Sequence, residues 1–161
     1  MARVVKPPAP LPLDEQTPKV FLAGSIEMGL AEDWQTQFEN SLSDLDVLLL
    51  NPRRDEWDAS WEQSITNPSF REQVEWELAG LERAEVVAMY FAPPTKAPVT
   101  LLELGLCARD GRLVVCCPAG YWRRGNVEVV CRRYGVPLLD SLPDLVAEVR
   151  RRLGAEASPS A

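Results

Sequence analysis

The sequence predicts a doubly wound α/β fold of the flavodoxin-like or Rossmann-like kind, a three-layer αβα arrangement around a five-stranded parallel sheet. Two observations carry this prediction: near-continuous apolar runs typical of strands buried on both faces, and helical patterns that separate those runs. The strands are expected at residues 19–23, 47–50, 86–91 and 113–117, with a weaker fifth at 136–139. The helices are expected at residues 31–43, 69–83, 100–110, 126–134 and 142–153.

Alternation of this kind implies right-handed crossovers between parallel strands, most simply in the five-stranded flavodoxin-like order. The chain of 161 residues is long enough for one domain with a core and too short for two ordinary domains. Residues 1–18 contain five prolines and no periodic pattern, so an extended leader is expected there. A single domain is expected over residues 19–153, and a flexible tail over residues 154–161.

Composition and charge restrict the class of partner. Apolar residues make up 46% of the chain and charged residues 25%, as in a soluble globular protein. The net charge of -7 disfavours a nucleic-acid polymer, because such a partner requires a basic surface, and favours a small-molecule ligand. No apolar run reaches the length of a membrane span, and the N-terminus is rich in proline where a signal peptide would be apolar. A cytoplasmic protein without a membrane partner is therefore expected.

The inventory of reactive residues is narrow. The four cysteines show no CxxC spacing and are expected to be free thiols in or near the core. The chain contains no histidine, which disfavours most zinc sites and every catalytic triad built on that residue. We therefore expect neither a metal nor a cofactor, and acid/base chemistry falls to carboxylates, lysine, tyrosine or cysteine.

Glu77 is the first candidate for that chemistry. On a helical wheel of residues 69–83 it falls between Gln73 and the apolar residues Phe70, Val74 and Leu81, whereas the other glutamates of the helix point elsewhere. A half-buried carboxylate has a raised pKa, which suits it to donate a proton near neutral pH. The alternative is a glutamate at the edge of the buried face that pairs with an arginine.

Glu103 is the second candidate, because it is the only ionisable residue of an otherwise apolar helical segment, residues 100–108. One interpretation is a capping box, in which Thr100 caps the helix and Glu103 binds the backbone N–H of Thr100. The other is a nucleophile. Both place the carboxylate in the first helical turn, where the helix dipole favours its ionised form. An ionised carboxylate in a dry cleft is what attack on a sugar carbon requires.

Further candidates lie where strands end, because ligands of such sheets bind beyond the carboxyl ends of the strands. Gly24 and Ser25 follow the first strand, and a tight turn explains them equally well. Arg53 and Trp57 follow the second strand and suit a phosphate or a base, although Arg53 could instead pair with the acidic surface. The predicted substrate-binding residues are Gly24, Ser25, Asn51, Arg53, Trp57, Gln73 and Asn126, of which Asn126 could also be a helix N-cap.

In these motifs the sequence resembles the nucleoside 2-deoxyribosyltransferase superfamily, and most closely its nucleoside 2-deoxyribosyltransferase-like branch. The resemblance extends from residue 19 to residue 139. It is carried by VFLAGSI at 20–26, NPRR at 51–54, QVEWEL at 73–78, TLLELG at 100–105 and RGNV at 124–127.

The resemblance implies roles for both glutamates. The family's nucleophilic glutamate lies in a Glu-x-Gly motif, which Glu103 and Gly105 match, and its acidic partner on the preceding helix corresponds to Glu77. The chain departs from the better-known transferases at Ala97, where they carry a base-contacting aspartate. The tyrosine of their first loop is also absent, and Ser25 stands in that region.

The activity that the resemblance implies is cleavage of the N-glycosidic bond of a (deoxy)nucleoside through a glycosyl-enzyme on Glu103, with transfer of the sugar to another nucleobase. Family members generally assemble as homo-oligomers. Related enzymes with a serine in the first loop hydrolyse nucleoside 5'-monophosphates, so an N-glycosidase is the first alternative. A nucleotide-binding sensor without turnover is the alternative from another class.

Overall fold

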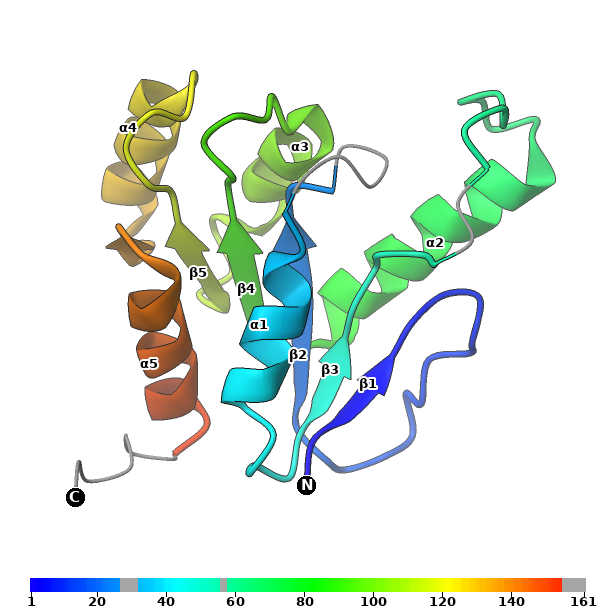
Figure 1. The fold of residues 1–161 in the computed structure, drawn as a ribbon, viewed down its shortest axis with the longest axis horizontal. Helices are drawn as coiled ribbons and strands as arrows, with labels where there is room; N and C mark the ends of the chain where they lie inside the picture. The colour runs from blue at the N-terminus through cyan, green and yellow to red at the C-terminus, as the bar shows by residue number, and fades with distance from the viewer. Residues whose placement is uncertain (27–31, 56–57, 155–161) are drawn as a thin grey trace.

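A computed structural model describes residues 1–26, 32–55 and 58–154 (Figure 1). Within these residues the chain forms an all-parallel six-stranded sheet with the order β1-β3-β2-β4-β5-β6. The strands are β1 (Arg3–Val5), β2 (Lys19–Gly24), β3 (Leu48–Leu50), β4 (Val86–Tyr90), β5 (Leu113–Cys116) and β6 (Leu138–Leu139). The five strands from β2 onward have the predicted flavodoxin-like order.

Five helices in the described part of the chain cover both faces of the sheet, which confirms the doubly wound α/β fold (Figure 1). The helices are α1 (Trp34–Ser41), α2 (Pro68–Arg83), α3 (Pro98–Cys107), α4 (Arg124–Tyr134) and α5 (Leu142–Arg152). One face of the sheet packs against α2, α3 and α4, and the other packs against α1 and α5.

The prediction of five strands was wrong by one, and the additional strand comes from the proline-rich N-terminal segment. Its three residues pair in parallel with β3 at the edge of the sheet, with Arg3 opposite Leu48 and Val5 opposite Leu50. The indole N–H of Trp76 donates to the carbonyl of Ala9 at 2.9 Å and fastens the following loop onto α2. Two of the three residues of β1 are exposed, so it lacks the buried apolar run by which the other strands were predicted, and its pairing with β3 defines it. Of the predicted tail, residues 155–161 lie outside the described residues.

Glycine allows two close contacts that position the elements of the site. A Cβ at Gly80 of α2 would lie 2.7 Å from the ring of Phe21, so this glycine lets α2 pack closely onto β2. A Cβ at Gly24 would lie 2.5 Å from the carbonyl oxygen of Tyr90 and 2.6 Å from the ring of Trp34. The end of β2 is therefore packed tightly between β4 and α1.

All six strands point the same way, so the loops after β2, β3, β4 and β5 meet at one edge of the sheet, the upper edge in Figure 1. This edge contains the predicted ligand-binding segments. Among the described residues, no helix combines the length and the apolar character that crossing a membrane would require.

Candidate active site

Glu77 and Glu103 come together on the α2 and α3 side of the sheet. Glu103 lies in the second turn of α3 and is buried, with 8% of its surface exposed, and Glu77 in the middle of α2 is half-buried. The two are close enough for the charge of Glu77 to act on Glu103. Neither carboxylate forms an ion pair with a cation in the described part of the chain. The alternative in which Glu77 pairs with an arginine is thus not found there.

Burial without a cation sets the protonation of this pair. Burial raises the pKa of Glu77 to about 7, against the smaller effect of a hydrogen bond from Gln73 that lowers it. Burial, together with the smaller effect of the charge of Glu77, raises the pKa of Glu103 to about 8. The pair therefore retains a proton at neutral pH. This differs from the sequence prediction that the helix dipole keeps Glu103 ionised, because desolvation outweighs the dipole once the side chain is buried.

The capping-box interpretation of Glu103 was wrong. Helix α3 begins at Pro98, two residues before Thr100, and its N-cap is Ala97, whose side chain makes no capping hydrogen bond. Thr100 is therefore inside the helix and Glu103 is one turn further on, out of reach of the helix start. A proline at the first helical position has no N–H to be capped, which explains why the helix starts earlier than the Thr100 pattern indicated.

Gln73 links the carboxylate pair to the loop after β3. Its side-chain amide nitrogen donates to the carbonyl of Pro52 at 3.1 Å and to Glu77 Oε1 at 3.5 Å. Its amide oxygen is buried and accepts no hydrogen bond from the described residues. Buried polar atoms are rarely left without a partner, so this oxygen is an available acceptor beside Glu77.

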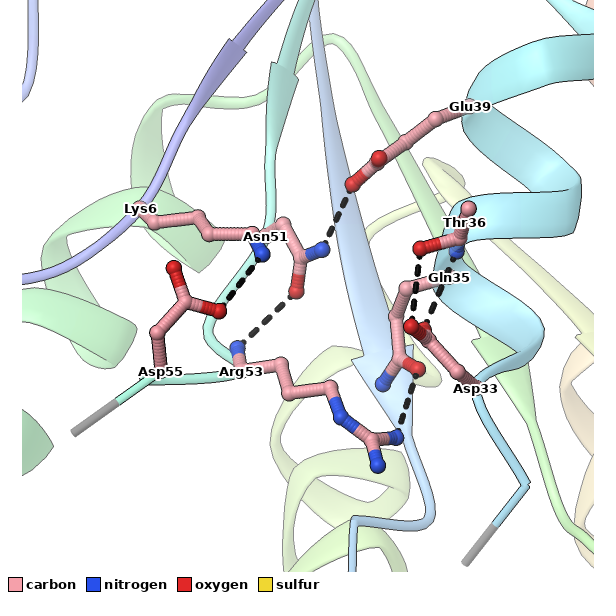
Figure 2. Close-up of polar contacts among 8 residues, drawn as sticks. All are labelled: Lys6, Asp33, Gln35, Thr36, Glu39, Asn51, Arg53 and Asp55. Carbon is pink, nitrogen blue, oxygen red and sulfur yellow. Dashed lines mark hydrogen bonds and ion pairs between the residues drawn. The ribbon is translucent and has the colours of Figure 1, made fainter. Parts of the chain in front are cut away.

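Asn51 and Arg53 shape the loop after β3 rather than lying free for a ligand (Figure 2). Asn51 is 1% exposed; its amide nitrogen donates to Glu39, and its amide oxygen accepts the backbone N–H of Arg53 at 2.9 Å. The guanidinium of Arg53 donates to Gln35 Oε1 at 3.3 Å, which joins the loop to the first turn of α1. Both predicted residues thus lie at the expected edge, with protein atoms as their contacts.

Ser25 is also held by protein atoms. It is 1% exposed, and its hydroxyl accepts the backbone N–H of Ala92 at 2.9 Å and shares a 2.7 Å hydrogen bond with Thr95 Oγ1. These bonds tie the loop after β2 to the loop after β4. Gly24, just before it, is required by the close approach of β4 and α1 described above.

Asn126 and Trp57 are the remaining predicted residues. Asn126 is exposed in the first turn of α4, and the N-cap of this helix is Arg123, so the interpretation of Asn126 as an N-cap was wrong. The helix starts two residues earlier than predicted because Arg124 and Gly125 are already helical. Trp57 lies outside the described residues.

A clamp on the backbone just before α3 was not predicted from the sequence. The hydroxyl of Tyr121 and the indole N–H of Trp122 both donate to the carbonyl of Lys96, at 2.6 and 3.0 Å. The next residue, Ala97, adopts a left-handed conformation with φ 47°, which is unfavourable for a residue with a Cβ. The loop after β5 thus holds a strained junction at the start of the helix that carries Glu103. Sequence spacing contained no signal for it, because the acceptor is a backbone carbonyl.

The described residues contain no group of three or more potential metal ligands of the His, Cys, Asp or Glu type. All four cysteines are free and buried, as predicted. Burial raises the pKa of Cys117 and of Cys131 to about 11, so these thiols are protonated at neutral pH and are not nucleophiles.

Comparison with curated protein sequences finds no match. The family model described as "Nucleoside 2-deoxyribosyltransferase like" matches residues 17–121, well over half of the chain. The matched segment contains β2 through β5 and the helices that carry both buried glutamates. It ends at Tyr121, one of the two residues that clamp the start of α3. By this match, the chain belongs to the nucleoside 2-deoxyribosyltransferase-like family.

Proposed function

We propose that this protein cleaves the N-glycosidic bond of a (deoxy)nucleoside and transfers the sugar to another nucleobase, with Glu103 as nucleophile and Glu77 as general acid. The observation that carries the proposal is the pair of carboxylates on α2 and α3, both with raised pKa values and neither bound to a cation in the described residues. Groups of this kind cluster at catalytic sites, because a pKa near neutrality suits proton transfer.

The proposed reaction has two steps, in which the sugar moves onto Glu103 and off it again while a proton leaves Glu77 and then returns. Glu103 attacks C1' through an oxocarbenium-like state, so that the C1'–O bond to the enzyme forms while the C1'–N bond breaks and Glu77 gives its proton to the departing base. The acceptor base then attacks C1', loses a proton to Glu77 and releases Glu103. The first half-reaction needs one proton on the pair, held by Glu77 when Glu103 attacks, and the raised pKa values keep the pair protonated near neutral pH. In the second half-reaction Glu103 is esterified and Glu77 starts without a proton, so it can accept the one that the acceptor base loses.

The substrate-binding residues that we propose surround this pair at the carboxyl edge of the sheet. Gln73 holds Glu77 and offers its buried amide oxygen to a hydroxyl or N–H of the substrate. Gly24, Ser25, Asn51 and Arg53 belong to the proposed set because they lie in the loops at this edge, where the contacts described above hold them in place. Trp57 and Asn126 complete the proposed set.

Hydrolysis of a nucleoside 5'-monophosphate is the second candidate, and Ala97 favours it. Better-known transferases of the superfamily contact the base with an aspartate at this position. Here the Ala97 side chain is 4% exposed and packs in the core cluster on the α2 and α3 side. Without a polar group from this position, the acceptor base is held less firmly and water competes for the glycosyl-enzyme.

The proposal also covers the assembly of the protein and its location in the cell. We propose a homo-oligomer that acts on small-molecule nucleosides or nucleotides and free bases. The free, buried cysteines fit a reducing compartment, so we place the reaction in the cytoplasm.

The direct test is incubation of the protein with a panel of nucleosides and 5'-monophosphates, with and without a free base, followed by chromatography of the products. A new nucleoside that appears only with added base supports transfer, whereas free sugar or sugar phosphate indicates hydrolysis. No turnover of any substrate, combined with binding that is unchanged in Glu103→Gln, would support a sensor instead.

The covalent step has its own test. A 2-fluoro-substituted nucleoside destabilises the cationic transition state and should leave a sugar adduct on the peptide that contains Glu103, detected by intact mass and peptide mapping. Inversion of configuration at C1' without an adduct would show direct attack by water and exclude Glu103 as nucleophile.

A further inference from the structure

The loop between β4 and α3, residues 91–97, is fastened at both of its ends by side chains from other loops. Its first part is tied to the loop after β2 by the hydrogen bonds of Ser25 described above. At its end, the hydroxyl of Tyr121 and the indole N–H of Trp122 both donate to the carbonyl of Lys96, at 2.6 and 3.0 Å. Helix α3 begins two residues later, so the loop after β5 acts on the start of this helix.

The last residue of the loop holds a backbone conformation that its own side chain disfavours. Ala97 has φ 47° and ψ 55°, and it is the single non-glycine residue with a positive φ among the described residues. A left-handed backbone at a residue with a Cβ persists only where the surroundings impose it. The carbonyl of Lys96 belongs to the peptide plane whose rotation defines φ of Ala97. Donors that fix this carbonyl therefore fix that angle directly.

Tyr121 is the better anchored of the two donors. Its side chain is 3% exposed, and its ring packs on that of Phe91 with 4.8 Å between the ring centroids. A ring enclosed in a close-packed core is held in one orientation, so the hydroxyl is aimed at the carbonyl. Trp122 is 54% exposed and lacks this enclosure.

Helix α3 is held differently before and after its catalytic candidate. Beyond Glu103, the side chains of Leu104 and Cys107 are buried in the core cluster. Before Glu103, one polar side chain of the helix, Thr100, is buried, and the N-cap Ala97 makes no capping hydrogen bond. The position of the first two turns therefore depends on the direction in which the chain leaves Ala97.

We propose that Tyr121 is a positioning residue for the reaction: its hydroxyl keeps Ala97 left-handed and so holds Glu103 at the place from which it attacks the sugar. Trp122 assists through the same carbonyl. Displacement of a reacting group by about 1 Å costs about 10²-fold in rate, so a fixed helix start matters for the chemical step. This inference rests on the proposed role of Glu103, whereas the link from Tyr121 to the start of α3 does not.

The first test removes the hydroxyl alone. Tyr121→Phe should lower kcat by about 10- to 10²-fold and change KM by less than about twofold, because the binding loops after β2 and β3 keep their contacts. The matched control is Tyr134→Phe, which loses a hydroxyl bonded to Arg109 at 3.3 Å on the exposed side of α4 and should leave kcat unchanged. Circular dichroism reports whether each variant is folded, and Trp122→Phe replaces Tyr121→Phe if the latter is not.

A second substitution separates positioning from a general loss of stability. Glycine enters the left-handed region without a steric penalty, so the loss caused by Tyr121→Phe should shrink to less than about threefold when Ala97→Gly is the background. The comparison is between the double variant and Ala97→Gly alone. A loss of the same size in both backgrounds, or an unchanged kcat in Tyr121→Phe, would overturn the positioning role.

The link from Tyr121 to α3 also has a readout that needs no turnover. Hydrogen exchange of the backbone amides of residues 99–103 should be faster in Tyr121→Phe than in the wild type and unchanged in Tyr134→Phe, while the amides of α5 exchange alike in all three proteins. Full activity of Glu103→Gln would overturn the proposed function and the positioning role together, and exchange would still decide the link. An inactive Glu103→Gln beside a Tyr121→Phe variant with unchanged exchange and kcat would overturn this inference alone.

Discussion

Two carboxylates on each side of the sheet have opposite environments. Next to α1, Asp44 accepts two hydrogen bonds from the guanidinium of Arg150 at 2.8 and 2.9 Å, and these bonds lower its pKa to about 2. Glu148 of α5 likewise has a lowered pKa, chiefly from its bonds to Arg151. On the other face, Glu103 is buried, Glu77 is half-buried, and neither pairs with a cation among the described residues; burial raises the pKa of Glu77 to about 7 and that of Glu103 to about 8.

On the function proposed above, the paired carboxylates serve the fold and the carboxylates without a cation serve the chemistry. A carboxylate beside an arginine is ionised at every physiological pH, so it has no proton to donate. Removal of its arginine partner lowers the stability of the fold. A carboxylate buried without a cation exchanges a proton near neutral pH, and its burial opposes folding. The following predictions test this contrast between the layers.

The largest expected effect is on turnover. Glu103→Gln should lower kcat/KM by about 10⁴-fold or more, as deletion of a nucleophile does, while Asp44→Asn should leave kcat/KM unchanged. Steady-state kinetics on the best substrate of the panel provide the measurement. Equal activity of the two variants would show that burial without a cation does not identify the catalytic carboxylate.

Glu77→Gln should lower the rate by about 10²- to 10⁴-fold, the usual contribution of a general acid. The loss should be smallest for nucleosides whose base leaves readily without protonation, because those substrates need the acid least. Rates across a series of leaving groups provide the measurement. A uniform loss across the series would mean that Glu77 positions the substrate or Glu103 instead.

The pH dependence of kcat/KM should be bell-shaped. The proposed active form of the pair carries one proton, so activity should fall about tenfold per pH unit below the lower pKa and above the upper pKa. The pKa values of about 7 for Glu77 and about 8 for Glu103 place the maximum of activity between these two pH values. Glu77→Gln should remove the limb that reports loss of the shared proton. A profile that is flat between pH 6 and 9 would contradict a proton shared by the pair.

The smallest effect concerns stability and has opposite signs for Glu103 and Asp44. The folded protein retains the Glu103 proton up to about pH 8, whereas a freely exposed glutamate loses it near pH 4.5, so stability falls as the pH rises between these values. Glu103→Gln should therefore raise the free energy of unfolding at pH 8 by more than about 1.4 kcal/mol, which corresponds to one pKa unit, and by less at pH 5. Urea denaturation at both pH values provides the measurement.

Asp44→Asn is the control for that measurement. Its pKa is lowered in the folded state, so its contribution to stability is present above the ordinary value of 3.8 and is lost only as the pH falls toward about 2. The variant should therefore lose stability at both pH 5 and pH 8. A gain in stability for Asp44→Asn would contradict the contrast between the layers.

The burial of the strands could be predicted from the sequence because a parallel sheet covered on both faces requires unbroken apolar runs. Residues 86–91 illustrate this: β4 (Val86–Tyr90) and Phe91 are buried throughout. The flanking strand β1 escaped prediction because its three residues include two that are exposed, and only pairing with β3 defines it. The start of α3 was predicted two residues too late, because it too depends on contacts distant in sequence. The left-handed Ala97 that precedes α3 is held by Tyr121 and Trp122, which lie more than twenty residues away.

From the sequence alone Glu77 and Glu103 could be singled out as candidates, because each stands beside apolar residues in a local helical pattern. Only the tertiary structure decided that the two share one environment, and that Ser25, Asn51 and Arg53 are already bonded to protein atoms. It alone also decided which side of the apolar helix α3 is left exposed. The physical reason is that desolvation and hydrogen bonding depend on neighbours distant in sequence, whereas periodicity depends on neighbours within a few residues.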